Sequence, residues 1–66
     1  MTGRELRAIR VELGLTQSGL AVVLGLRAGT ISDLERGKMK ISLSVEKHLL
    51  TVHALHQIGL IIKKVL

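Results

Sequence analysis

Apolar residues recur at helical spacing in four stretches of the chain, and glycines or short polar segments separate these stretches. In the first stretch Leu6, Ile9 and Leu13 fall on one helical face, which predicts a helix over residues 3–13. The second stretch predicts a helix over residues 16–24. Its apolar positions are Leu20, Ala21 and Leu24.

The second helix carries chemical signals at both of its ends. Thr16 is of a residue type whose hydroxyl caps helix N-termini, and Gly25 can take the left-handed conformation that ends a helix in a tight turn. A third helix is expected over residues 27–36, with Ile31 and Leu34 as its apolar positions. The pattern therefore predicts two short helices joined by a glycine-containing turn.

The fourth stretch predicts a helix over residues 44–58 that ends at Gly59. Its apolar stripe consists of Val45, Leu49, Val52, Leu55 and Ile58. The segment LIIKKVL, residues 60–66, fits either a continuing helix or a β-branched strand with an unpaired edge. We favour the strand, because glycine breaks helices and an unpaired edge needs a partner, which a second copy across a twofold axis would supply.

The expected fold class is all-α, with a four-helix domain over residues 1–58 and a C-terminal dimerisation segment over residues 59–66. A single hydrophobic core is only marginally stable in a chain of 66 residues, so a homodimer is the first expectation. We assign the dimer interface to the end of the fourth helix and the C-terminal segment. Its residues are Leu55, Ile58, Leu60, Ile61, Ile62 and Val65.

The residue types present argue against an enzyme. The chain has no cysteine, which excludes a disulfide framework and a thiolate nucleophile, and no nucleophile, base and orienting residue can be assembled. No glycine-rich phosphate loop follows a predicted strand, so no cofactor is expected. His53 and His56 lie three residues apart on one helix, but no cysteine or nearby carboxylate completes a metal site. With His48, they are expected to be polar residues at the rim of the dimer interface.

Ten Lys and Arg against five Asp and Glu give a formal net charge of +5, which suits nucleic acid, an acidic partner or an anionic membrane surface. The first ten residues carry charges where a signal peptide needs an apolar run, and the longest apolar run, IGLII, is too short to span a bilayer. We therefore expect a cytoplasmic protein. Lys63 and Lys64 are too few cations for a stable membrane-surface anchor, so no membrane partner is expected.

Two short helices joined by a turn, the second closed by glycine and followed by cations, have the geometry of a helix-turn-helix. The segment RAIRVELGLTQSGLAVVLGLRAGTISDLERGK resembles the Xre family of prokaryotic DNA-binding proteins, which includes phage repressors such as the lambda repressor. The resemblance covers roughly residues 4–55. The matching positions are Leu15, Thr16, Gln17, Leu20, Ala21, Leu24, Gly25, Thr30, Ile31, Ser32, Glu35, Gly37 and Lys38.

This resemblance implies that the third helix enters the major groove of double-stranded DNA and that the start of the second helix holds a phosphate. The implied base-reading residues are Arg27, Ala28, Gly29, Thr30, Ser32 and Asp33. The implied phosphate-binding residues are Thr16, Gln17 and Ser18, together with the cations Arg36, Lys38 and Lys40. Helix N-termini bind anions and cations contact phosphates, which supports both sets. Arg10 and Glu35 match positions that form an ion pair in family members, so we assign them to structure.

The base-reading positions depart from relatives that carry bulky amides at the second and third of them. Ala28 still offers a methyl group to a thymine methyl, and Gly29 lets the backbone approach the groove floor. Hydrogen bonding then shifts to Arg27, which suits guanine, with Thr30 adaptable and Asp33 able to accept from a cytosine amine. We expect modest direct readout and more reliance on DNA shape and backbone contacts.

Simpler alternatives stand beside these assignments. The basic face could be the solvated surface of an interaction domain, and Gln17 could be a solvated first-turn residue. Arg27 could be a plain surface charge, and Asp33 could belong to the solvent face of its helix.

The expected function is sequence-specific DNA binding by a homodimer that places two copies of the third helix about 34 Å apart on a palindromic operator. Such a protein would act as a transcriptional repressor, regulating its own small operon in a prophage, an anti-CRISPR locus or a toxin–antitoxin locus. The alternative is an antitoxin whose main role is to bind and neutralise a partner toxin protein.

Overall fold

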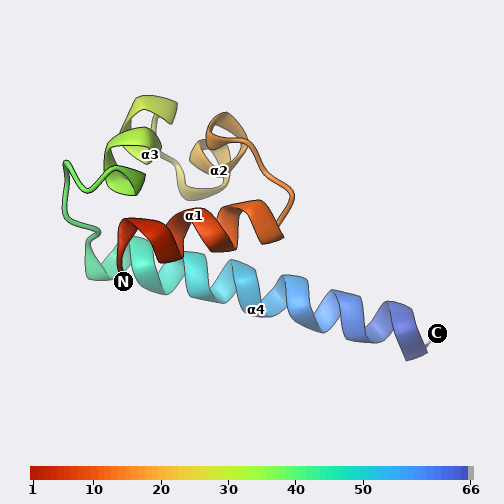
Figure 1. Ribbon diagram of the computed structural model, residues 1–66. Coiled ribbons are helices and arrows are strands. Elements are labelled where there is room, and N and C mark those ends of the chain that lie inside the picture. Colours follow the sequence, from red (N-terminus) through yellow and green to blue (C-terminus); the bar gives the residue numbers. More distant parts are fainter. Residues whose placement is uncertain (66) are drawn as a thin grey trace.

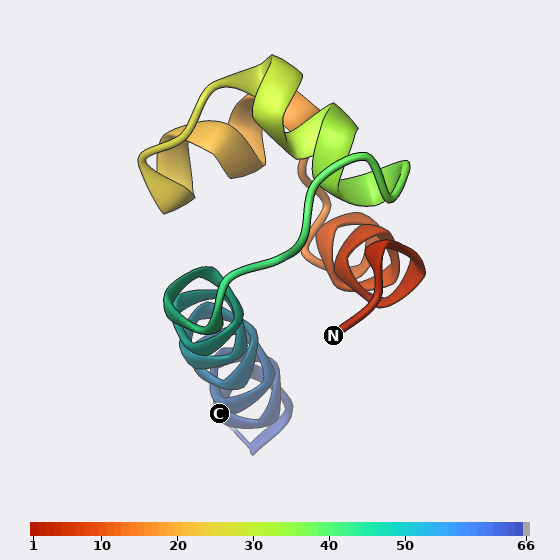
Figure 2. The same cartoon turned by 90° about the vertical axis from the view of Figure 1, so that its left-hand side faces the viewer.

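The computed structural model describes residues 1–65, without the side chains of Ile61 and Val65. Its elements are four helices: α1 (Gly3–Glu12), α2 (Gln17–Leu24), α3 (Ala28–Glu35) and α4 (Leu43–Val65). The helices α2 and α3 form one layer, α1 lies beneath them, and α4 runs along the opposite side of the molecule (Figures 1 and 2). The second half of α4 extends beyond the other helices (Figure 1). The all-α prediction is confirmed.

The helix ends follow from the sequence signals at each of them. Thr2 and Glu5 form a capping box at the start of α1, in which each side chain accepts a hydrogen bond from the backbone amide of the other residue, at 3.2 and 3.0 Å. The first three helices each stop before a glycine with φ between 68° and 75°; these are Gly14, Gly25 and Gly37. Their bounds differ from the expected ones by no more than one residue.

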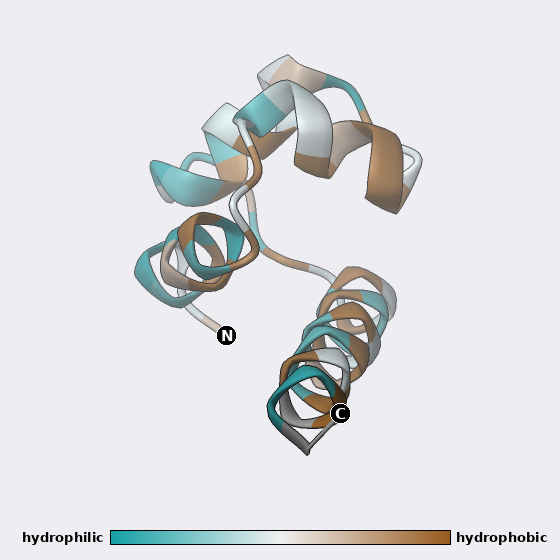
Figure 3. Cartoon of the chain, turned by 90° about the vertical axis from the view of Figure 1, so that its right-hand side faces the viewer, coloured by the Kyte–Doolittle hydropathy of each residue, from teal (hydrophilic) through white to brown (hydrophobic). Residues whose placement is uncertain are grey.

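The core is aliphatic and small, and every helix contributes to it. Its fully buried residues are Leu6, Leu20, Ala21, Ile31, Leu34 and Leu49. All of them fall on the apolar faces that the pattern predicted. Leu49 is the single core residue of α4 within the described chain, because the rest of that helix lies at the edge of the bundle or beyond it. Figure 3 shows apolar residues on the side of α4 that faces away from the other helices as well.

Two polar contacts join the N-terminal segment and α1 to α4. The Met1 amine lies 2.6 Å from Oε1 of Glu46, and the Nε2 atom of His53 lies 2.6 Å from Oε2 of Glu12. The hydrogen bond and charge of Glu46 raise the pKa of the Met1 amine. These two contacts hold the first half of α4 along the whole length of α1.

The C-terminal segment corrects the sequence-based expectation. The pattern predicts a helix that ends at Ile58 and favours a strand over residues 60–66, but α4 continues through Gly59 to Val65. The strand prediction is wrong, because one glycine costs a helix only about 1 kcal/mol relative to alanine, whereas a strand in this position would have no neighbour to pair with. Leu66 and the side chains of Ile61 and Val65, which belong to the expected dimerisation segment, lie outside the described part of the chain.

None of the helices in residues 1–65 combines the length and the apolar character needed to cross a bilayer.

Gly3 lets α1 approach the end of α3 closely, and this contact can be tested. A methyl group at position 3 would lie 2.5 Å from the carbonyl oxygen of Glu35 and 2.6 Å from that of Leu34. Since both atoms are backbone, we expect Gly3→Ala to lower the free energy of unfolding by about 1–3 kcal/mol in urea titrations followed by circular dichroism. Gly29→Ala is the matched control, because nothing lies within 4 Å of its added methyl, and it should stabilise by up to about 1 kcal/mol. Equal loss in both variants would contradict the close approach.

Candidate nucleic-acid interface

The turn between α2 and α3 fixes how the two helices are placed. After Gly25 takes the left-handed conformation, the Leu26 amide donates to the carbonyl of Ala21 at 2.8 Å and the Gly25 amide donates to that of Val22 at 3.3 Å. This bonding satisfies the last carbonyls of α2, and the Leu26 side chain packs against the core. Three residues then suffice to connect α2 to α3, which is the arrangement of a helix-turn-helix.

A half-buried ion pair connects α3 to α1. The Nε atom of Arg10 lies 2.6 Å from Oε2 of Glu35, and its Nη2 atom donates to Oε1 at 3.1 Å. The two side chains are only 13% and 5% exposed. This two-point contact between a guanidinium and a carboxylate restricts direction as well as distance. The structure thus brings together the two residues that the family resemblance paired.

The same ion pair reaches the start of α2. The Nη1 atom of Arg10 donates to the carbonyl of Leu15 at 2.9 Å, and the amide nitrogen of Gln17 donates to Oε1 of Glu35 at 3.3 Å. Burial by itself would raise the pKa of Glu35, but the hydrogen bonds from Arg10 and Gln17 and the charges of Arg10 and Arg7 outweigh it and lower that pKa. The hydrogen bond from Glu35 raises the pKa of Arg10 in turn. The pair is therefore ionised at neutral pH.

The expected base-reading residues lie on α3 and at its N-cap, and they differ in exposure. Ile31 and Leu34 point into the core, while Gly29 and Arg36 are exposed on the opposite side of the helix. The other members on α3 are half-buried: Ala28, Thr30, Ser32 and Asp33. Arg27 precedes the helix as its N-cap residue, is exposed, and makes no capping bond with its side chain. The sequence pattern had placed it inside the helix.

The start of α2 has free hydrogen-bond donors. The Thr16 hydroxyl accepts from the Gly19 amide at 3.0 Å, as its N-cap position predicted, and keeps its own hydrogen available. Within residues 1–65, the backbone amides of Gln17 and Ser18 donate to no protein acceptor. Two amides at a helix N-terminus, next to two hydroxyls, are suited to an oxyanion such as phosphate.

Gln17 does more than the sequence indicated. It was expected to contact phosphate, but one of its side-chain hydrogens is directed to Glu35 in the interior. Its backbone amide and its second side-chain hydrogen remain available at the helix start. No sequence signal could show this contact, because it depends on the position of α3 relative to α2.

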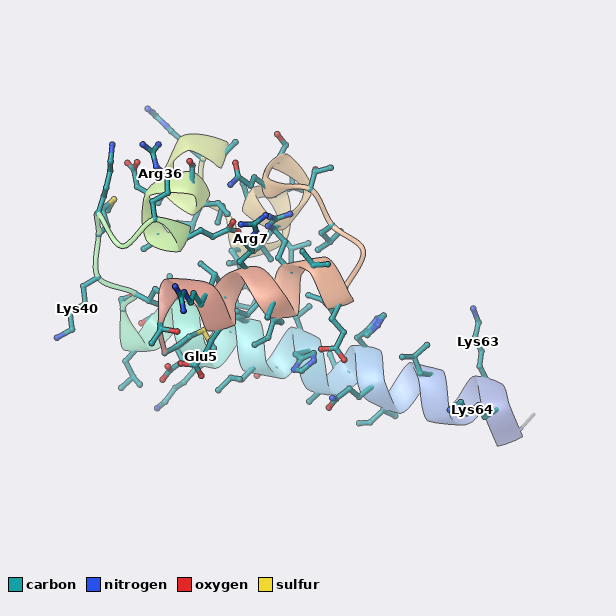
Figure 4. The ribbon with its side chains drawn as sticks, in the orientation of Figure 1. Glu5, Arg7, Arg36, Lys40, Lys63 and Lys64 are labelled. Atoms are coloured by element: carbon teal, nitrogen blue, oxygen red, sulfur yellow. The ribbon has the colours of Figure 1, made fainter. Side chains whose placement is uncertain are left out.

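Cations continue the surface beyond α3. Arg36 is the residue that caps α3, and Lys38 and Lys40 lie in the loop that leads to α4; all three are exposed. Figure 4 shows Arg36 beside α3 and Lys40 pointing away from the body at the start of α4, whereas Lys63 and Lys64 lie at the other end of that helix. We call Arg27, Arg36, Lys38 and Lys40 the cationic rim of α3.

The residues expected in the dimer interface lie on the extended half of α4. Leu55, Ile58, Leu60 and Ile62 are all exposed. Of the histidines, His53 is bound to Glu12 and His48 is exposed. Among the described residues there is no cluster of three His, Cys, Asp or Glu side chains and no pocket.

A family model named Helix-turn-helix (HTH_3) matches residues 6–45, more than half of the chain. The chain belongs to this helix-turn-helix family. The matched segment runs from the first core leucine to the start of α4, so it contains the whole motif and both partners of the ion pair. This places the protein among the Xre, or lambda-repressor-like, DNA-binding transcription regulators, a family of regulators and not of enzymes. No curated protein and no solved structure matches the chain.

The ion pair makes the fold sensitive to acid. Because the pKa of Glu35 in the folded protein is below its ordinary value of 4.5, the stabilisation it provides is complete above that value and is lost as the pH falls through the lowered one. Glu35→Gln leaves the Arg10 charge without its partner, so we expect a loss of about 2–4 kcal/mol at neutral pH.

Urea titrations of the wild type and Glu35→Gln at several pH values measure this effect. The stability difference between them should shrink as the pH falls below 4.5. The control Arg4→Gln replaces an exposed cation on α1, the helix that carries Arg10, and should change the free energy of unfolding by no more than about 0.5 kcal/mol. A pH-independent difference would argue that Glu35 acts through packing and not through charge.

Proposed function

We propose that the protein represses transcription by binding a palindromic operator as a homodimer. One observation carries this proposal. The exposed face of α3 is flanked by the cationic rim and by the free amides at the start of α2, and this arrangement lies within a helix-turn-helix chain. Base edges in the major groove and the phosphates on either side of it are the ligands that such a surface fits.

We assign base reading mainly to Arg27 and Gly29. The Arg27 guanidinium sits at the entrance of α3, and no hydrogen bond or ion pair engages it within the described chain. It can therefore form the two-point contact that identifies guanine. Gly29 has open space around its missing Cβ, so its lack of a side chain serves no packing inside the protein. A backbone without a side chain can come close to the groove floor, next to the methyl of Ala28.

Phosphate binding is assigned to two groups of residues that lie on either side of α3. The first is the start of α2, where the hydroxyls of Thr16 and Ser18 and the amide of Gln17 can donate to one phosphate. The second consists of Arg36, Lys38 and Lys40, whose exposed charges can neutralise neighbouring phosphates. Asp33 is the only acid on this face of α3, and we assign it to a cytosine amine.

A homodimer is supported by the apolar surface of α4. Leu55, Ile58, Leu60 and Ile62 would be covered by a second copy, and two copies of α3 could then meet successive turns of the major groove, about 34 Å apart. Occupying a promoter in this way would block transcription. Regulation of its own small operon is the simplest biological setting for such a protein.

DNA titrations test the assigned roles. A duplex enriched by the protein from a random library is compared with a scrambled duplex of equal composition, at several salt concentrations, by fluorescence anisotropy. Arg27→Ala should narrow the affinity ratio between the two duplexes about tenfold, because one two-point base contact is lost. Lys38→Ala should weaken binding to both duplexes by the same factor. It should also reduce the slope of log affinity against log salt concentration by the amount expected for about one phosphate contact. Arg4→Ala removes an exposed cation to which no DNA contact is assigned, so it is the control and should change neither quantity.

Equal binding of both duplexes by the wild type would contradict the repressor function. The antitoxin alternative would then be tested by co-expression with the protein encoded beside it.

Gly29 offers a second test, in which stability and binding change in opposite directions. Gly29→Leu should raise the free energy of unfolding by up to about 1 kcal/mol, since leucine is the better helix former and the site is open. Its affinity for the enriched duplex should nevertheless fall by about tenfold or more, because the side chain would hold α3 away from the bases. A variant that is more stable and binds with unchanged affinity would remove Gly29 from the interface.

A further inference from the structure

The chain has two helical glycines that its own fold does not explain. Gly3 is needed for the close approach of α1 to α3, and three other glycines end helices with positive φ. Gly29 and Gly59 have helical backbones, and no atom of the part of the chain that the structure describes lies within 4 Å of a Cβ added at either. Glycine is among the poorest helix formers, so a glycine in the middle of a helix needs a reason. For Gly29 the proposed reason is a close approach of the backbone to DNA. For Gly59 the reason must also be a contact with another molecule.

Gly59 lies between exposed apolar side chains on one face of α4. Leu55 precedes it by four residues and Ile62 follows it by three, so the three share a side of the helix. Leu55 is 64% exposed and Ile62 is 50% exposed. We call Leu55, Gly59 and Ile62 the Gly59 face. A small residue between two larger apolar ones is a surface against which a second helix can pack at short distance.

The charges of α4 indicate what covers this face. Between Lys47 and Lys63 the sequence contains no Asp, Glu, Lys or Arg, although the whole chain carries a formal net charge of +5. A nucleic acid or an acidic protein would be recognised by cations, and this segment has none. Two copies of a basic chain repel each other least where both surfaces are uncharged, so the segment suits a second copy of itself.

We propose that two copies of the protein dimerise by crossing their α4 helices in antiparallel orientation at Gly59, with Leu55 and Ile62 of each copy packed around the crossing. This inference rests on the proposed homodimeric function and specifies its interface. An antiparallel crossing separates Lys63 and Lys64 of one copy from those of the other, whereas a parallel pair would bring all four together. The helix dipoles also oppose each other favourably in that orientation.

Two flanks of α4 carry exposed apolar residues, one on either side of the face with Leu49 that packs on the body. The Gly59 face is one of these flanks and lies one turn from the half-buried His56. Leu43, Leu50 and Ala54 are exposed on the opposite flank, where no glycine allows a second helix to approach closely.

Sedimentation equilibrium of the wild type and two leucine variants tests the inference. Gly59→Leu should raise the dimer dissociation constant by about tenfold or more, because a bulky side chain blocks the crossing. Leucine is the better helix former, so loss of helix cannot cause this result, and circular dichroism checks that the helix content is kept. Ala54→Leu, on the opposite flank of the same helix, is the matched control and should change the constant less than about twofold.

Cysteine cross-linking provides an independent measurement, since the chain has no cysteine of its own. Gly59→Cys should form a disulfide-linked dimer under mild oxidation, because a residue at the twofold crossing faces its own copy within bonding distance. Ala54→Cys should remain largely monomeric in denaturing gels.

Each outcome separates this inference from the proposed function. A wild type that stays monomeric at all concentrations, or a dimer weakened by Ala54→Leu and not by Gly59→Leu, would overturn the Gly59 crossing. DNA discrimination is measured separately, by titrating a duplex with a single half-site. If discrimination survives while the crossing fails, the base-reading role of α3 stands. If the crossing holds and discrimination is absent, only the DNA function fails.

Discussion

The ion pair between Arg10 and Glu35 is the interaction on which the placement of α3 depends. The core of this protein is made of small aliphatic side chains and contains no aromatic residue, and hydrophobic burial of this kind has no directional preference. The two-point contact of the guanidinium with the carboxylate supplies direction, at the C-terminal end of α3. Through Gln17 and the carbonyl of Leu15, the same contact reaches the start of α2. One network therefore holds α2 and α3 in a fixed relative position.

The chain separates its two surfaces by charge. Around α3 and the loop after it, exposed cations outnumber acids, while the middle of α4 has no formal charge at all. The family match covers the first of these surfaces and stops near the start of α4. The surface that we propose for DNA binding thus lies within the matched segment or just beside it, and the second half of α4 lies outside the match.

Much of the fold could be predicted from the sequence because its signals are local. The apolar periodicity identified the core faces of all four helices, and Thr16 and Gly25 marked the ends of α2 correctly. The end of α4 was predicted wrongly, because one glycine costs a helix only about 1 kcal/mol, whereas a strand there would have no neighbouring strand to pair with. The bond from Gln17 to Glu35 and the contact of Met1 with Glu46 could not be predicted, since each joins segments whose relative position only the tertiary structure defines.

The extended half of α4 has a consequence for the spacing of any operator. A helix is a rigid rod in which each residue adds a fixed rise and a fixed rotation, so the stretch from Leu49, in the core, to Gly59 amounts to a ruler of about 15 Å. In a dimer crossed at Gly59, inserting one residue into that stretch would increase the distance between the two copies of α3. It would also rotate one copy of α3 relative to the other by more than a quarter turn. Relatives with a longer or shorter α4 would then be tuned to half-sites of different separation and helical phase, with no change in the bases that they read.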